Sequence, residues 1–94
     1  MAAYIIVIRE KIHDPAPLDR YAQIAATAPR DQLNRLARYG HHEVVEGAGC
    51  EGVAILEFPD MAQARAWYGS PQYQEARQYR RQAGDYRVMI VEGL

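Results

Sequence analysis

Two apolar runs, one near each end of the chain, constrain its fold more than any other feature of the sequence. Residues 3–8 (Ala-Tyr-Ile-Ile-Val-Ile) and residues 86–91 (Tyr-Arg-Val-Met-Ile-Val) are rich in β-branched side chains and do not alternate cleanly between polar and apolar. A strand with this pattern presents apolar side chains on both faces, and both faces therefore need cover. The chain has 94 residues, fewer than a typical domain of about 100–150, and residues 1–94 are expected to form one domain.

The other elements are predicted from helical spacing, turn residues and capping signals. Charged residues 9–11 are expected to end the first strand, and Asp14 with Pro15 is typical of a helix start, the helix then running to about Ala28. Residues 31–39 are ambiguous, because Leu33, Leu36 and Tyr39 permit a helix while a weak alternation permits a strand. The remaining predictions are strands over 42–46, 53–58 and 86–91, and helices over 61–68 (capped by Asp60) and 72–83 (opened by Ser70 and Pro71).

The order strand, helix, strand, strand, helix pair, strand is that of the ferredoxin-like βαββαβ fold, an α+β architecture. Right-handed crossovers from both halves place the helices on one face of its antiparallel sheet. The other face would then expose a larger apolar patch than a monomer tolerates, because Ile5 and Val7 oppose Tyr4, Ile6 and Ile8. We therefore expect a homodimer in which the helix-free faces of two sheets cover each other.

Composition narrows the partners and the compartment. The formal net charge of −1 predicts no binding to nucleic acid or to an anionic membrane surface. Cys50 is the only cysteine, so neither a disulfide framework nor a thiolate metal cluster is expected. No apolar run reaches the ~18 residues of a membrane helix and no signal-peptide pattern opens the chain, which is typical of a cytoplasmic protein. Every basic residue except Lys11 is arginine, which reflects either codon usage or a few arginines that face a carboxylate or phosphate.

Motifs in the second half of the chain resemble a bacterial family, domain of unknown function 1330. They are Leu-Glu-Phe-Pro at 56–59 and the run from Ala64 to Gln74 (Ala-Arg-Ala-Trp-Tyr-Gly-Ser-Pro-Gln-Tyr-Gln), with Arg80 and the closing Val-Glu-Gly at 91–93. The resemblance implies the dimeric α/β-barrel superfamily with a ferredoxin-like protomer, and it favours a strand over residues 33–39. It also implies a pocket between sheet and helices, since that superfamily includes cofactor-independent enzymes. The chain departs from the family pattern at residues 36–43, where most members have paired glycines and an arginine-tyrosine strand.

Two residues are predicted to carry acid–base chemistry. His42, within His41-His42-Glu43, is either an exposed surface histidine or a general acid or base. Adjacent strand residues point to opposite faces, which disfavours a metal site at the two histidines, and no metal is predicted. Glu57 ends an apolar strand and must be paired if it is buried, since an unpaired buried carboxylate is costly. It is either an ion-pair partner of Arg77, Arg80 or Arg87, or a carboxylate on the floor of a pocket.

The predicted substrate-binding residues are arginines and aromatics on predicted helices and strands. Tyr73, Arg77 and Arg80 fall on one face of the last helix, where the two arginines either pair with strand carboxylates or form a lip that recognises an anion. Trp67 and Tyr68 cannot both face inward, so one packs in the core and the other lines a groove. The predicted set is Tyr39, Trp67, Tyr73, Arg77 and Arg80.

Two functions are compatible with these features. The first is a cofactor-independent enzyme that acts on a small organic molecule in a pocket between sheet and helices. The second is a non-catalytic module of the same fold that binds a small molecule or another partner. The sequence contains no phosphate-binding glycine loop and no Ser/His/Asp order, and no cofactor is predicted.

Overall fold

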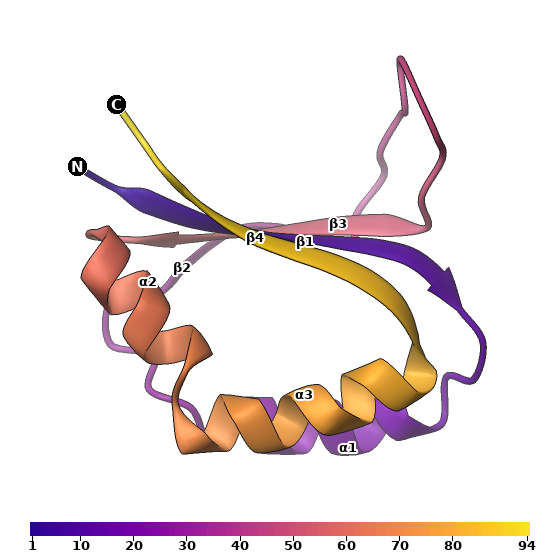
Figure 1. The fold of residues 1–94 in the computed structure, drawn as a ribbon, viewed down its shortest axis with the longest axis horizontal. Helices are drawn as coiled ribbons and strands as arrows, with labels where there is room; N and C mark the ends of the chain where they lie inside the picture. The colour runs from indigo at the N-terminus through magenta and orange to yellow at the C-terminus, as the bar shows by residue number, and fades with distance from the viewer.

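The computed structural model describes residues 1–94 and contains four strands and three helices. Their order is β1 (Ala3–Ile12), α1 (Pro17–Ala25), β2 (Asn34–Arg38), β3 (Gly52–Phe58), α2 (Met61–Tyr68), α3 (Pro71–Ala83) and β4 (Gly84–Glu92). All three helices cover one face of the sheet, with α1 and α3 side by side (Figure 1). None of these helices is both long enough and apolar enough to span a bilayer.

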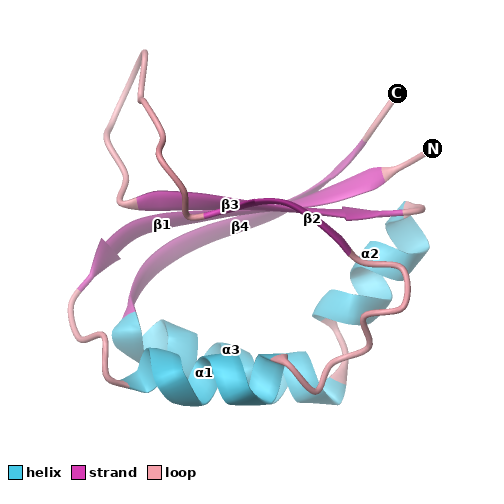
Figure 2. Ribbon diagram, turned by 180° about the vertical axis from the view of Figure 1, so that it is seen from behind, coloured by secondary structure: helices cyan, strands magenta, loops and turns pink.

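The four strands form one sheet in the order β2-β3-β1-β4, and every neighbouring pair is antiparallel. This is the ferredoxin-like topology, as the element order predicted. The connection between β2 and β3 projects from the face that carries no helix, away from α1 and α3 (Figure 2). The two chain ends also extend on this side of the sheet, and no helix covers it.

The two faces of β1 separate as its sequence predicted. Ala3, Ile5 and Val7 are buried beneath the helices, whereas Tyr4 and Ile6 lie on the helix-free face and are only partly buried. The pairing continues these faces onto the neighbouring strands, since Ile6 is opposite Ile55 of β3 and Met89 of β4. Met89 and Val91 are 39% and 44% exposed, so the helix-free face presents apolar side chains to solvent.

The predicted strand over residues 42–46 is wrong. These residues belong to the connection between β2 and β3 and pair with no strand. The reason is that β3 does not begin until Gly52, and its outer edge is already occupied by β2. Residues 34–38 do form a strand, which resolves the ambiguous stretch in favour of the expectation from the family resemblance.

Several predicted boundaries also differ from the structure, those of β1 and α1 by the most, and β4 runs over 84–92 instead of 86–91. β1 continues past Arg9 to Ile12, because β4 pairs with it on both sides of a bulge between Arg9 and Lys11. The first helix begins at Pro17 instead of Pro15, because the Asp14 carboxylate accepts from the Ala16 N–H (3.1 Å) and forms a turn before the helix. It ends at Ala25, and a turn carries the chain to Ala28.

The predicted caps of the last two helices are confirmed. The Asp60 carboxylate accepts from the Gln63 N–H (2.8 Å), and the Ser70 hydroxyl accepts from the Tyr73 N–H (3.2 Å). The last helix then leads into β4 without a connecting loop, because it ends at Ala83 and the strand begins at Gly84. A Cβ at Gly84 would overlap the carbonyl oxygen of Lys11, so only glycine fits where β4 meets β1.

Aromatic rings fill the space between α2, α3 and the sheet. Tyr73 is at the centre, with its ring centroid 4.3 Å from that of Trp67 and 5.3 Å from that of Tyr68. Phe58 of β3 packs on Trp67, with 5.7 Å between the ring centroids. Trp67 is buried and Tyr68 only partly so, but both rings pack against Tyr73, so the prediction that only one of the two faces inward is only partly right.

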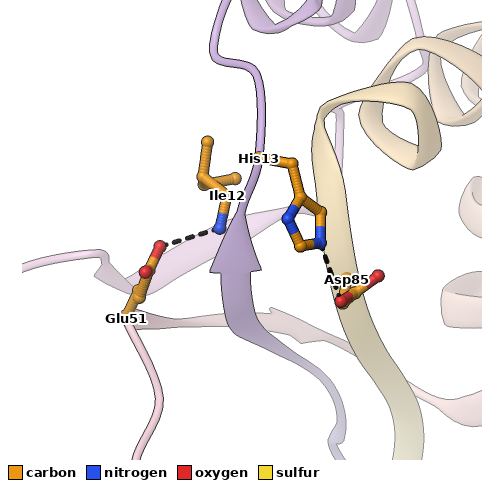
Figure 3. A network of polar contacts seen from close by, with 4 residues as sticks. All are labelled: Ile12, His13, Glu51 and Asp85. Atoms are coloured by element: carbon orange, nitrogen blue, oxygen red, sulfur yellow. Dashed lines mark hydrogen bonds and ion pairs between the residues drawn. The ribbon is translucent and has the colours of Figure 1, made fainter.

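Polar contacts fix the far end of β1 to its neighbours (Figure 3). The Glu51 carboxylate accepts from the Ile12 N–H at 2.8 Å, and His13 Nε2 lies 2.9 Å from a carboxylate oxygen of Asp85. The N–H groups of His13 and Asp14 both donate to the carbonyl of Ala83. The start of the first crossover and the end of the last helix are thus joined.

Candidate functional site

A cavity of about 220 Å³ lies between the sheet and α1. Val7, Ala54 and Leu56 form its apolar floor on the sheet. Small and apolar residues of α1 form the opposite wall, and Trp67 and Tyr73 lie at the end where the aromatic cluster begins. The other lining residues are Arg9, Leu18, Tyr21, Ala22, Ala25, Arg30, Leu33, Arg35, Arg38 and Tyr39.

Four arginines and no acidic residue line this cavity, although the chain as a whole has 12 acidic and 11 basic residues. None of the four takes part in an ion pair, since the three ion pairs of the structure join other residues. Arg30, Arg35 and Arg38 are close enough to repel one another. Partial burial, followed by repulsion from Arg30 and Arg38, lowers the pKa of Arg35 below its usual value. The cavity therefore offers positive charge that no side chain neutralises.

Arg9 is held by two tyrosines. Its guanidinium carbon lies 3.9 Å from the centroid of the Tyr39 ring, and its Nε–H donates to the Tyr86 hydroxyl (2.9 Å). Tyr39 has a φ of 55°, which is unusual for a bulky residue. Its ring lies over Gly52, where a Cβ would come within 2.8 Å of the ring carbon Cδ1. Tyr39 is thus placed by a strained backbone and by a glycine that leaves room for its ring.

A pair of tyrosine hydroxyls also reaches the cavity. The hydroxyl of Tyr21 on α1 lies 3.1 Å from that of Tyr73 on α3. Burial, reinforced by Tyr73, raises the pKa of Tyr21 far above its ordinary value. Burial, followed by the neighbouring Tyr86, also raises the pKa of Tyr39, against the opposing charges of Arg9 and Arg80. Tyr21 and Tyr39 are therefore protonated at neutral pH and can act as hydrogen-bond donors.

Arg80 is buried, at 4% exposure, and forms no ion pair. Its guanidinium carbon lies 4.9 Å from the centroid of the Tyr86 ring, and its Nε has no hydrogen-bond partner in the protein. The indole N–H of Trp67 is likewise buried without a partner. Arg77 donates to the Tyr68 hydroxyl (3.1 Å) and does not line the cavity.

The structure places His42 and Glu57 away from the cavity. His42 is in the β2–β3 connection, with Nε2 3.1 Å from the Cys50 carbonyl oxygen and 3.8 Å from its sulfur. Glu57 is opposite Tyr4 on the helix-free face, where its carboxylate accepts from the Asn34 side chain (3.2 Å). The predicted ion pair between Glu57 and Arg77, Arg80 or Arg87 is wrong, because those arginines and Glu57 do not meet. His, Cys, Asp and Glu side chains nowhere gather in threes as a metal site requires.

Three of the seven predicted site residues therefore line the cavity together: Tyr39, Trp67 and Tyr73. Sequence reasoning did not assign Arg9, Arg30, Arg35, Arg38 or Tyr21 to it. The one signal that pointed to these arginines was the near absence of lysine, which reflects either codon usage or a role for guanidinium groups and does not identify which ones.

The raised pKa values predict an incomplete tyrosine titration. In the folded protein at pH 11, absorbance of tyrosinate should account for fewer than the seven tyrosines of the chain. A phenol that holds its proton more tightly when folded contributes stability that is fully present below the unfolded pKa of about 10 and is lost as the pH rises above it. Tyr21→Phe should make the loss of stability between pH 10 and 12 shallower. A titration that reaches seven tyrosinates before unfolding would contradict the buried placement of Tyr21 and Tyr39.

The sheet order and the helices on a single face make this a ferredoxin-like α+β protein. Residues 2–94 match a family model described as domain of unknown function (DUF1330). The chain belongs to this family, and the resemblance seen in its motifs is confirmed. No curated protein matches it in sequence.

Several solved structures share the fold. RPA0582, a protein of unknown function from Rhodopseudomonas palustris, gives a TM-score of 0.68 at 19% identity, over 99% of this chain and 82% of that one. A dimeric ferredoxin-like protein of unknown function from Thermobifida fusca gives 0.62 at 11% identity, over 98% and 90%. SnoaB, a cofactor-independent oxygenase from Streptomyces nogalater, gives 0.57 at 14% identity, over 99% and 92%. At these identities the likeness shows a common fold.

Proposed function

We propose that this protein is a cofactor-independent enzyme that binds a small organic anion in the cavity between the sheet and α1. The observation that carries the proposal is the lining of that cavity, where four arginines surround an apolar floor with no carboxylate among them. A guanidinium binds a carboxylate through two parallel hydrogen bonds, and such charge-assisted bonds are among the strongest in proteins. The apolar floor and the Trp67 ring suit the hydrocarbon part of the ligand.

The same residues supply donors where negative charge develops on a substrate oxygen. The Tyr21–Tyr73 hydroxyl pair can donate to such an oxygen, and Arg9 adds positive charge nearby. Donors that are already fixed in place stabilise a developing oxyanion without having to reorganise as water would. Reactions that pass through an enolate or a phenolate are of this kind. The likeness in fold to SnoaB, described as a cofactor-independent oxygenase, supports an enzyme by analogy.

A second candidate, a non-catalytic binding protein, is favoured by one observation. No His, Cys, Asp or Glu lines the cavity, and Tyr21 and Tyr39 hold their protons tightly, so no lining side chain is an effective base at neutral pH. His42 and Glu57 would act as the predicted acid and base only if they reached a ligand outside this cavity. Turnover separates the two candidates, because both require binding.

We also propose a homodimer formed through the helix-free face of the sheet. The apolar side chains on that face, including Ile6, Ile55, Met89 and Val91, support it, because a monomer would leave them in water. Fold relatives described as dimeric add weight by analogy. We propose as well that the protein is located in the cytoplasm.

Binding is tested with small carboxylates and their uncharged amides. Benzoate and hexanoate should raise the melting temperature, whereas benzamide and hexanamide should not. Arg35→Gln should weaken carboxylate binding about tenfold, since it removes a charge-assisted hydrogen bond. Arg81→Gln, at an exposed position of α3, is the matched control and should leave affinity unchanged.

Two results would decide between the alternatives. Equal binding of acids and amides would contradict an anion site. Carboxylates that bind and remain chemically unchanged over hours with the protein, by proton NMR in air and under nitrogen, would favour the binding protein over the enzyme.

A further inference from the structure

The least explained charge in the protein is Arg80. A guanidinium at 4% exposure, with no carboxylate partner and with its Nε unpaired, is costly to bury. Other arginines of this chain reach solvent, but Arg80 is enclosed between α3 and β4. A cost of this kind needs an explanation, and neutralisation by a ligand would supply one.

Arg80 shares its aromatic neighbour with an arginine of the cavity. The guanidinium carbon of Arg80 lies 4.9 Å from the centroid of the Tyr86 ring, and that of Arg9 lies 5.7 Å from the same centroid. The Tyr86 hydroxyl also accepts a hydrogen bond from Arg9 Nε. Arg9 in turn covers the ring of Tyr39. The four side chains form a row with two positive charges and no negative one, which we call the inner cluster: Tyr39, Arg9, Tyr86 and Arg80.

The inner cluster is separate from the arginines on the β2 side of the cavity. Arg9 is opposite Gly52, whereas Arg38 is opposite Ala54 and Arg35 opposite Leu56, with β3 lying between β1 and β2. With strands about 4.8 Å apart and ~3.4 Å per residue, the Cα of Arg9 lies ~12 Å from that of Arg38 and ~17 Å from that of Arg35. The repulsion that acts on Arg35 comes from Arg30 and Arg38 and not from Arg9, which agrees with two groups.

We infer that the cavity has two oxyanion subsites, one at Arg9 and Arg80 and one at Arg30, Arg35 and Arg38, and that its ligand is a small organic dianion. This inference rests on the proposed function and narrows its substrate class from an organic acid to a molecule with an acidic group at each end. Arg9 contacts the inner acidic group, since it lines the cavity, and Arg80 adds its charge from its place over the Tyr86 ring, close enough to act on the cavity residues Tyr21 and Tyr39. Both carboxylates and phosphates fit a guanidinium, so either can supply the inner group.

The inference is tested by matched ligands with one or two acidic groups. Terephthalate should bind at least tenfold more tightly than benzoate, and adipate more tightly than hexanoate, by isothermal titration calorimetry. A second comparison uses phenyl phosphate and 4-carboxyphenyl phosphate. If affinity rises more from phenyl phosphate to 4-carboxyphenyl phosphate than from benzoate to terephthalate, the inner group is a phosphate, and if it rises less, the inner group is a carboxylate.

Substitution of Arg80 then locates the second subsite. Arg80→Met keeps an unbranched stem. It should weaken the binding of terephthalate at least tenfold and change the affinity for benzoate less than twofold. It should not lower the melting temperature of the ligand-free protein, because it removes a buried charge that nothing in the chain neutralises. Arg9→Gln should show the same selective loss of affinity for terephthalate, and it replaces Arg80→Met as the test variant if Arg80→Met does not fold. Arg81, the next residue, is exposed, and Arg81→Gln should leave the affinity for both ligands unchanged.

Different outcomes contradict different conclusions. If none of the acids binds, the proposed function fails and the dianion with it. If terephthalate and benzoate bind equally and Arg80→Met weakens neither, the proposed function stands and the second subsite is wrong. A loss of equal size for both ligands, or a lower melting temperature of the ligand-free variant, would make Arg80 a structural residue and overturn the inference.

Discussion

Replacing Gly84 with alanine should lower the free energy of unfolding by about 3 kcal/mol, the cost of forcing an extra methyl into a packed site. Gly84 directly follows α3, and a methyl group on its Cα would overlap the carbonyl oxygen of Lys11 and lie 3.0 Å from the Cα of Ile12. Both obstacles are backbone atoms of β1, which cannot rotate away as a side chain does. For a chain of this size the loss corresponds to roughly 15 °C in melting temperature.

Gly49→Ala is the matched control for this substitution. Gly49 lies in the β2–β3 connection, has no atom within 4 Å of its Cβ position and has no positive φ. Its substitution should leave the melting temperature within about 2 °C of the parent. If Gly84→Ala and Gly49→Ala unfold at the same urea concentration and at the same temperature, β4 does not approach β1 this closely in solution.

Substituting Ile55 with glutamate should convert a dimer to a monomer. Ile55 lies in the middle of the helix-free face, opposite Ile6 of β1 and Ala37 of β2. If two such faces cover each other, each glutamate would be buried without a partner, which costs several kcal/mol per carboxylate. The dissociation constant of the dimer should rise by at least about a hundredfold.

Light scattering coupled to size exclusion gives the readout. The parent protein should elute with twice the chain mass of 10.7 kDa at micromolar concentration, and Ile55→Glu with the chain mass itself. Ala62→Glu, at an exposed position of α2, places the same charge on the other side of the molecule and should remain dimeric. A monomeric parent, or a dimeric Ile55→Glu variant with native circular dichroism, would contradict the proposed interface.

Local signals were sufficient to predict most of the fold. The caps at Asp60 and Ser70 depend on a side chain and an N–H three residues later, so they are readable from neighbouring positions. The strand over 42–46 failed for a non-local reason. Its composition suits a strand, but a strand needs a partner edge, and β2 had already taken the edge of β3.

The candidate site was harder to predict because its charges depend on strand register. Arg35 and Arg38 are three residues apart, and in a regular strand they would point to opposite faces. A bulge between Arg35 and Ala37 turns both toward the helices and into the cavity. Alternation along β3 correctly separated Glu57 from Phe58, but which of the two faces lay under the helices was not readable from that strand alone.

The cavity also has a consequence for the motions of this protein. It lies between α1 and the sheet, lined by Leu18, Ala22 and Ala25 on one side and by Val7 and Ala54 on the other. An occupant would fill this space, and residues 17–25 would then be held down by a molecule that is not part of the chain. Amide hydrogen exchange along α1 would therefore report the residence time of the ligand, and the lifetime of the protein against proteolysis would depend on its supply.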